Sequence, residues 1–178
     1  MNWILCGMMG AGKTTVGVRI AQKTGRRWYD TDGMIVDRHG KISAIFEYYG
    51  EEYFRKLETQ IVKELAGQDG LILSTGGGLV LQAENDKLLK ENGKIVFLRA
   101  KAETLFERLK LDDVRPLLHG SAENLKVRLQ ELLLERGAVY ESVADFVVDV
   151  DGKEIDDVAD EIIALIVENE KTDGAGTR

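Results

Sequence analysis

The chain has 178 residues, of which 44% are hydrophobic and 31% are charged, so it suits one α/β domain with a buried core. Its formal net charge of −7 argues against binding nucleic acid or an anionic membrane, because either would need a basic face. No run approaches the ~18 apolar residues of a membrane span, and the N-terminus lacks the basic region of a signal peptide. Cys6 is the only cysteine, which excludes a disulfide within the chain. We therefore expect a cytoplasmic protein.

A short apolar run at 3–6 leads into residues 7–14, which fit the phosphate-binding pattern G-x-x-x-x-G-K-[ST]. A helix follows through Lys23, so the motif has the strand, loop and helix that it needs. Backbone N–H groups and the helix dipole then face the phosphates. Lys13 is expected to reach the β- and γ-phosphates, and the Thr14 hydroxyl to ligate Mg²⁺. Chance produces this pattern in under ~1 in 100 chains of this length, so we expect nucleoside triphosphate binding.

Further strands and helices alternate along the chain, which predicts a parallel sheet covered on both faces. The predicted strands after the first are 28–29, 71–73, 95–98 and 146–148. The predicted helices are one capped by Thr31 that stops near Gly40, one capped by Ser43 that runs to Tyr49, and others over about 51–66, 84–91, 103–110, 124–143 and 155–168. Tyr48, Tyr49 and Tyr53 are interpreted as packing aromatics. We expect a single domain over 1–170 and a flexible tail over 171–178.

Residues 111–123 interrupt the alternation, because they have no period of 2 or 3.6 and contain the only proline. An irregular run of this length inside a compact domain is more often functional than filler. Arg115 precedes that proline and is placed to move over bound phosphates. We therefore predict a lid over 111–123.

Asp30 and Asp32 end the second predicted strand, where parallel sheets bind their ligands. A Mg²⁺–triphosphate needs an acidic or hydroxyl ligand, and phosphoryl transfer needs a group that orients the attacking hydroxyl. The two carboxylates alternate along an extended segment and can share one site. The alternative is that both are helix-capping or surface acids.

The third predicted strand lacks the aspartate that many P-loop proteins carry near its end, so Asp30 must supply much of the metal's electrostatics with Thr14 and water. Three glycines at 76–78 follow this strand and allow a very close approach to the backbone. They are either a flexible turn or, as we favour, a loop that contacts substrate.

Two arginines outside the lid are candidates for binding an anionic substrate. Arg55 lies three residues before Glu58 on one helix, so the carboxylate can hold the guanidinium. Arg136 lies late in the long helix, just before Gly137. Periodicity alone places neither arginine in the site, and either can be a solvated surface residue.

The chain resembles shikimate kinase over about 3–165. The segments that carry the resemblance, in the order and spacing of that family, are GMMGAGKTTVG at 7–17, YDTD at 29–32, Phe54-Arg55 with Glu58, STGGG at 74–78, RPLL at 115–118 and R-x-x-x-Y at 136–140. The resemblance implies a P-loop NTPase fold of the nucleoside-monophosphate-kinase type. Its three layers are built on a five-stranded parallel sheet in order 2-3-1-4-5.

The resemblance also implies transfer of the ATP γ-phosphoryl group to the 3-hydroxyl of shikimate, the fifth step of aromatic amino-acid biosynthesis. ATP and shikimate are the implied partners, Mg²⁺ is the implied cofactor, and a monomer is expected. Asp30 matches the metal-associated aspartate, with Thr14 as the other metal ligand. Asp32 matches the aspartate that binds the shikimate hydroxyls and is proposed as the base.

Further residue roles follow from the same resemblance. Arg55, Gly77 and Arg136 match the groups that hold the shikimate carboxylate and ring, with Glu58 steadying Arg55. Lys13, Asp32 and Arg115 are the implied catalytic residues. The implied ATP-binding residues are Gly10, Ala11, Gly12, Lys13, Thr14, Thr15, Arg108 and Arg115.

Two segments depart from many relatives. Gly137 stands in the Arg136 motif where relatives often have proline, and is expected to loosen the helix there. Residues 110–113 are Lys-Leu-Asp-Asp, with two acids where relatives are often richer in glycine and asparagine. These departures bear on kinetic constants rather than on whether the chain is active.

Two other functions remain open at this point. A related small-molecule kinase, such as a gluconate or nucleotide kinase, shares the P-loop and lid but not the combined Asp-Thr-Asp, triple glycine and two arginines. A nucleotide-binding regulatory module that no longer transfers phosphate would be expected to have lost Lys13, Thr14 or Asp32, and all three are present.

Overall fold

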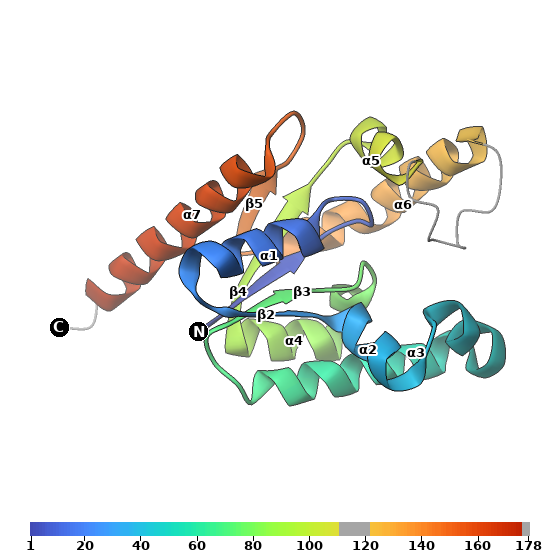
Figure 1. The fold of residues 1–178 in the computed structure, drawn as a ribbon, viewed down its shortest axis with the longest axis horizontal. Helices are drawn as coiled ribbons and strands as arrows, with labels where there is room; N and C mark the ends of the chain where they lie inside the picture. The colour runs from blue at the N-terminus through green and yellow to red at the C-terminus, as the bar shows by residue number, and fades with distance from the viewer. Residues whose placement is uncertain (111–121, 176–178) are drawn as a thin grey trace.

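Five parallel strands form a single sheet in the order β2-β3-β1-β4-β5 (Figure 1), which confirms the predicted topology. The computed structural model describes residues 1–110 and 122–175. The strands are β1 (Asn2–Cys6), β2 (Arg27–Asp30), β3 (Leu71–Ser74), β4 (Gly93–Arg99) and β5 (Phe146–Asp149). Every residue of β1 is buried, and Ile4 pairs with Leu73 on one side and Ile95 on the other. An apolar run of this kind forms a central strand because both of its faces are covered.

Helices cover both faces of the sheet and complete three layers. The helices are α1 (Lys13–Thr24), α2 (Thr31–His39), α3 (Ile42–Ala66), α4 (Ala83–Asn92), α5 (Ala102–Leu109), α6 (Ala122–Val143) and α7 (Ile155–Ala175), with a 3₁₀ turn η1 (Leu79–Leu81). α1 and α7 lie side by side on one face, and α3 and α4 lie on the other (Figure 1). Arg19 and Lys23 of α1 form ion pairs with Asp156 of α7. None of the described helices has the length and apolar composition that crossing a membrane requires.

The start of α2 differs from the prediction. Asp30, rather than Thr31, is the N-cap, because its Oδ1 accepts a hydrogen bond from the Gly33 N–H at 3.1 Å. The Thr31 hydroxyl is buried and accepts instead from the N–H of Gly76 at 2.9 Å. A tertiary contact has therefore taken the hydroxyl that local sequence offered as a cap.

α3 is bent at Gly50, whose φ of 79° and ψ of 172° are non-helical. This bend confirms the predicted division between a helix that ends at Tyr49 and another that starts at Glu51. The predicted Ser43 cap is wrong, since α3 begins at Ile42 and its N-cap, Lys41, makes no side-chain cap bond. Glycine at position 50 is needed because other residues rarely adopt a positive φ.

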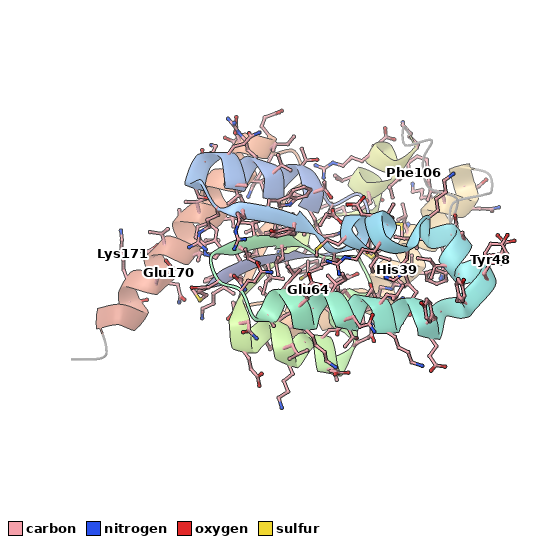
Figure 2. All side chains as sticks on the ribbon, turned by 60° about the horizontal axis from the view of Figure 1, so that its bottom comes forward. His39, Tyr48, Glu64, Phe106, Glu170 and Lys171 are labelled. Atoms are coloured by element: carbon pink, nitrogen blue, oxygen red, sulfur yellow. The ribbon has the colours of Figure 1, made fainter. Side chains whose placement is uncertain are left out.

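Tyr48 and Tyr49 are not the packing residues that were predicted. Their side chains are 74% and 66% exposed, and Tyr53 is exposed as well. Figure 2 shows Tyr48 at the outer edge of the molecule, pointing away from the sheet. The Tyr49 and Tyr53 rings contact each other, with their centroids 4.9 Å apart. The apolar stripe of α3 is instead carried by Leu57, Ile61 and Leu65, all buried.

The last two helices are at least as long as the sequence predicts. α6 runs through Gly137 without a break, and the expected loosening of the helix there stays a prediction. α7 continues to Ala175, beyond the predicted end near Glu168 and into the segment expected to be a tail. The lid expected over 111–123 lies almost entirely outside the described residues. The single-domain assignment stays a prediction.

The carboxyl ends of β1, β3 and β2 meet at one edge of the sheet. Ser74 pairs in register with Leu5 of β1 and with Asp30 of β2. The P-loop, the Asp30–Asp32 turn and the glycine loop at 76–78 all leave the sheet at this edge. Parallel α/β sheets bind their ligands there.

Candidate active site

The loop between β1 and α1 has the backbone that phosphate binding requires. Gly7, Gly10 and Gly12 have φ values of 136°, 79° and 93°, which residues other than glycine rarely adopt. A Cβ on Gly7 would also lie only 2.7 Å from the carbonyl oxygen of Leu98. The Lys13 ammonium donates to the carbonyls of Gly7 and Met8, both at 2.8 Å, and is thereby held against the loop. α1 starts directly after this loop, and the N-terminus of a helix attracts anions.

Thr14 and Asp30 bring two hard oxygen ligands together. The Thr14 hydroxyl donates to Asp30 Oδ2 at 2.7 Å, while Asp30 Oδ1 caps α2. The cap holds the carboxylate in one orientation beside the hydroxyl. Mg²⁺ prefers oxygen ligands such as carboxylates and hydroxyls, so these two residues fit a magnesium ion.

Ser74 occupies the end of β3, where many P-loop proteins carry an acid. Its buried hydroxyl donates to the Lys13 carbonyl at 2.8 Å and accepts from the Trp28 indole N–H at 3.0 Å. A Cβ on Gly17 would lie 2.6 Å from both Ser74 Oγ and Trp28 Nε1. Ser74 therefore fixes the start of α1 against the sheet. Sequence reasoning missed this role, because a serine at a strand end carries no distinctive pattern.

The three glycines at 76–78 contact the predicted substrate-binding groups directly. A Cβ on Gly76 would overlap Asp32 Oδ1 and lie 3.1 Å from Glu58 Oε1. A Cβ on Gly78 would overlap the Arg55 guanidinium. A Cβ on Gly77 would lie 3.7 Å from the Gly7 carbonyl oxygen and 3.8 Å from the Met9 nitrogen of the P-loop. The close approach predicted for this loop is therefore made by the protein's own side chains and by the P-loop.

Arg55 is held by acids on its own helix, as the spacing to Glu58 predicts. Its Nη1 donates to Glu58 Oε2 at 2.7 Å, and its Nε and Nη2 donate to Glu51 Oε1 at 3.2 and 2.8 Å. The Gln82 side chain donates to the same Glu58 oxygen at 3.1 Å. Burial raises the pKa of Glu58 to about 7, against the opposing effect of Arg55 and with a further contribution from Asp32. Sequence reasoning missed Glu51 and Gln82.

Tyr140 joins α6 to both loops. Its hydroxyl donates to the Gly77 carbonyl at 2.5 Å and lies 3.7 Å from the sulfur of Met8. The ring is fully buried and stacks on Phe97, with centroids 5.1 Å apart. Burial raises the pKa of Tyr140 to about 12, while the positive charges of Arg136 and Arg55 oppose the shift. The spacing of four between Arg136 and Tyr140 on one helix indicates a shared face.

Arg136 therefore lies near the glycine loop. Its charge, like that of Arg55, opposes the rise in the pKa of Tyr140. Its buried Nε has no hydrogen-bond partner among the described residues. A buried guanidinium N–H without an acceptor is costly, and an anionic ligand would satisfy it.

Arg108 lies between the P-loop and the end of β5. Its Nη1 donates to the carbonyls of Gly10 and Ala11, both at 3.2 Å, and its Nη2 donates to the Val150 carbonyl at 3.4 Å. Thr15 is exposed at the start of α1. At the end of β5, Asp149 is engaged in an ion pair with Arg99. Arg115 lies outside the described residues.

Comparison with known proteins is consistent across sequence and structure. The family model described as shikimate kinase matches residues 9–167. A shikimate kinase of Actinobacillus succinogenes is 42% identical over 166 residues, which is 93% of this chain and 94% of that protein. A shikimate kinase of Neisseria meningitidis serogroup C is 46% identical over 147 residues, covering 82% of this chain and 85% of that protein.

Solved structures agree with these relatives. The Acinetobacter baumannii shikimate kinase in complex with shikimate superposes with a TM-score of 0.88 at 40% identity, covering 94% of this chain and 93% of that one. A gluconokinase from Sinorhizobium meliloti has a TM-score of 0.67 at 20% identity and shares the fold alone. The chain belongs to the shikimate kinase family.

Proposed function

We propose that this chain transfers the γ-phosphoryl group of ATP to the 3-hydroxyl of shikimate, giving shikimate 3-phosphate and ADP. The observation that carries the proposal is the contact of one glycine loop with three groups. Gly76 packs on Asp32, Gly78 packs on Arg55, and Gly77 lies against the P-loop. A carboxylate that can orient a hydroxyl and an arginine that can hold a carboxylate thus meet beside the phosphate site.

The nucleotide belongs at the P-loop. We assign its phosphates to residues 10–15, with the Lys13 ammonium turning from its carbonyl partners to the β- and γ-phosphates. Arg108, beside the loop after β5, is assigned to the adenine side, and Arg115 to the phosphates. A Mg²⁺ ion would be held by Thr14 and Asp30, and when bound it offsets the negative charge of the phosphates.

Shikimate belongs beside the phosphate site, at the groups that contact the glycine loop. Arg55 and Arg136 are assigned to its carboxylate, and Gly77 to contact with the ring. The buried, unpaired Nε of Arg136 supports this assignment among the residues that the structure describes. Arginine suits the task because its parallel N–H groups bind a carboxylate in a bidentate manner.

Asp32 is assigned to the attacking hydroxyl. The 3-oxygen of shikimate forms a bond to the γ-phosphorus while the bond from that phosphorus to the bridging oxygen of ADP breaks. The hydroxyl proton passes to the Asp32 carboxylate late in this step, because the transition state is loose and depends mainly on alignment.

Parallel assays with shikimate, gluconate and nucleoside monophosphates test the proposal. We expect ATP consumption above background only with shikimate, and phosphorus NMR of the product should place the phosphate on the 3-oxygen. Turnover of gluconate with no turnover of shikimate would overturn the proposal.

Two further properties are proposed with this function. We infer that the enzyme acts as a cytoplasmic monomer that binds neither nucleic acid nor membrane, which agrees with its acidic net charge of −7. Light scattering coupled to size-exclusion chromatography measures the oligomeric state, and a mass of about twice the 19.8 kDa chain would contradict the monomer.

A further inference from the structure

Arg55 donates hydrogen bonds to two carboxylates that differ sharply in burial. Its Nη1 donates to Glu58, and its Nε and Nη2 both donate to Oε1 of Glu51. The Glu58 side chain is 1% exposed, whereas the Glu51 side chain is 64% exposed. Glu58 is therefore a fixed part of the structure, while water competes with Arg55 for Glu51.

Glu51 uses the donors of Arg55 that suit a bound carboxylate. The Nε–H and one Nη2–H of a guanidinium point in parallel, and together they hold both oxygens of a carboxylate. Glu51 accepts from both nitrogens with a single oxygen, at 3.2 and 2.8 Å. A ligand carboxylate that approaches this edge of Arg55 therefore meets an acid already in place.

The surroundings make it unfavourable for Glu51 and a second anion to stay at Arg55 together. Asp32 and Glu58 both approach Gly76, so two more carboxyl groups lie on the protein side of this region. Like charges at such spacing repel each other. The exposed Glu51 is the acid that can swing into solvent.

We propose that Glu51 competes with the substrate carboxylate for Arg55, so that shikimate displaces Glu51 when it binds. This inference rests on the proposed function and adds a positioning residue that weakens substrate affinity through Arg55. An exposed ion pair between residues four apart on a helix is weak, so displacing it lowers affinity only about two- to five-fold. If Glu51 instead braced Arg55 for the substrate, its removal would have the opposite effect.

The test is shikimate binding to the full chain, measured by calorimetry without nucleotide. Glu51→Gln and Glu51→Ala should both bind shikimate about two- to five-fold more tightly than the wild type. Glu52→Gln is the matched control, since Glu52 forms an ion pair with Lys56, also four residues on, and is 86% exposed. The control removes the same charge from the same helix and should leave the Kd as it is.

Two further readouts separate competition from a structural effect. In steady-state assays the Glu51 variants should lower the KM for shikimate much more than they change kcat. With the methyl ester of shikimate, which has no carboxylate, the Glu51 variants should lose their advantage over the wild type.

The failures are distinguishable. A wild-type enzyme that neither binds nor phosphorylates shikimate overturns both the proposed function and this inference. A wild-type enzyme that phosphorylates shikimate, combined with Glu51 variants whose binding is unchanged or weaker, overturns the competition alone.

Discussion

The carboxyl groups at this site differ in their surroundings, and those surroundings separate their roles. Asp30 is tied to Thr14 and to the start of α2. Asp32 lies one residue beyond Thr31 and packs on Gly76. Glu58 is buried and accepts from Arg55 and Gln82. These surroundings support the proposed assignment of Asp30 to the metal, Asp32 to the reacting hydroxyl and Glu58 to the arginine assigned to the substrate carboxylate.

Asp32→Asn tests the role of the second acid. Asparagine keeps the shape and one acceptor oxygen but loses the charge and basicity, so kcat should fall by roughly 10²–10⁴. Mg²⁺–ATP affinity should stay within a few-fold, because Thr14 and Asp30 are assigned to the metal. The measurements are kcat and nucleotide Kd on one folded preparation, with the exposed Asp37→Asn of the same helix as control. Equal losses of turnover and nucleotide binding would mean that the two aspartates have been exchanged.

The raised pKa of Glu58 predicts that the stability of the fold depends on pH. Burial raises its pKa from 4.5 to about 7, so the folded state holds this proton more tightly than the unfolded state does. The resulting stabilisation is full below pH 4.5 and is lost as the pH rises through 7. The free energy of unfolding of the wild type, relative to Glu58→Gln, should therefore fall by on the order of 3 kcal/mol between these limits. Urea unfolding of both proteins at pH 5 and pH 8 measures the change, and a difference that does not vary with pH would contradict it.

At the scale of elements, the glycine loop is held between two helices. α3 supplies Arg55 and Glu58 on one side, and α6 supplies Arg136 and Tyr140 on the other. The Tyr140 hydroxyl bonds to the middle glycine and contacts Met8 of the P-loop. Tyr140 thus links α6 to both the glycine loop and the P-loop.

Tyr140→Phe tests this connection. The variant leaves the Gly77 carbonyl without its phenol donor, so the glycine loop is held less firmly and the KM for shikimate should rise several-fold. The KM for ATP should change less, because the P-loop backbone is set mainly by its own glycines and by Ser74. Steady-state kinetics with each substrate varied in turn gives both constants. Tyr48→Phe makes the same chemical change at an exposed position of α3 and should have no effect.

At the scale of the whole molecule, the central strand leads directly into the candidate phosphate site. β1 is buried along its whole length, pairs with β3 and β4, and runs directly into Gly7 of the P-loop. The side chains that pack on β1 fix the position at which the P-loop leaves the sheet. The buried five-residue strand β1 and the phosphate-binding loop are therefore continuous in the chain.

Ile4→Ala should lower the free energy of unfolding by about 2–5 kcal/mol, because Ile4 is fully buried and its removal leaves a cavity. Ile155→Ala, at a residue 45% exposed at the start of α7, should cost much less. Chemical denaturation of both variants measures the difference. Similar losses in the two would show that the centre of the sheet tolerates a cavity.

Local patterns, such as apolar runs, helical spacing and glycine stops, predicted most element bounds to within a few residues. The strand order was predicted from the resemblance to shikimate kinase rather than from these patterns. Errors arose where a distant group captured a side chain. Thr31 bonds to Gly76 instead of capping α2. The tyrosines on either side of the bend at Gly50 are exposed instead of packing on the core.

The sequence by itself determined the phosphate site and the order of the motifs, because the glycine spacing of the P-loop forces its backbone conformation. Only the tertiary structure decided which residues hold the loops and side chains of the candidate site in place. Tyr140 and Gly77 are 63 residues apart, Ser74 and Lys13 are 61 apart, and Gln82 and Glu58 are 24 apart. No pattern within a helix or strand links residues so distant, so these contacts exist only once the sheet has assembled and brought its loops to one edge.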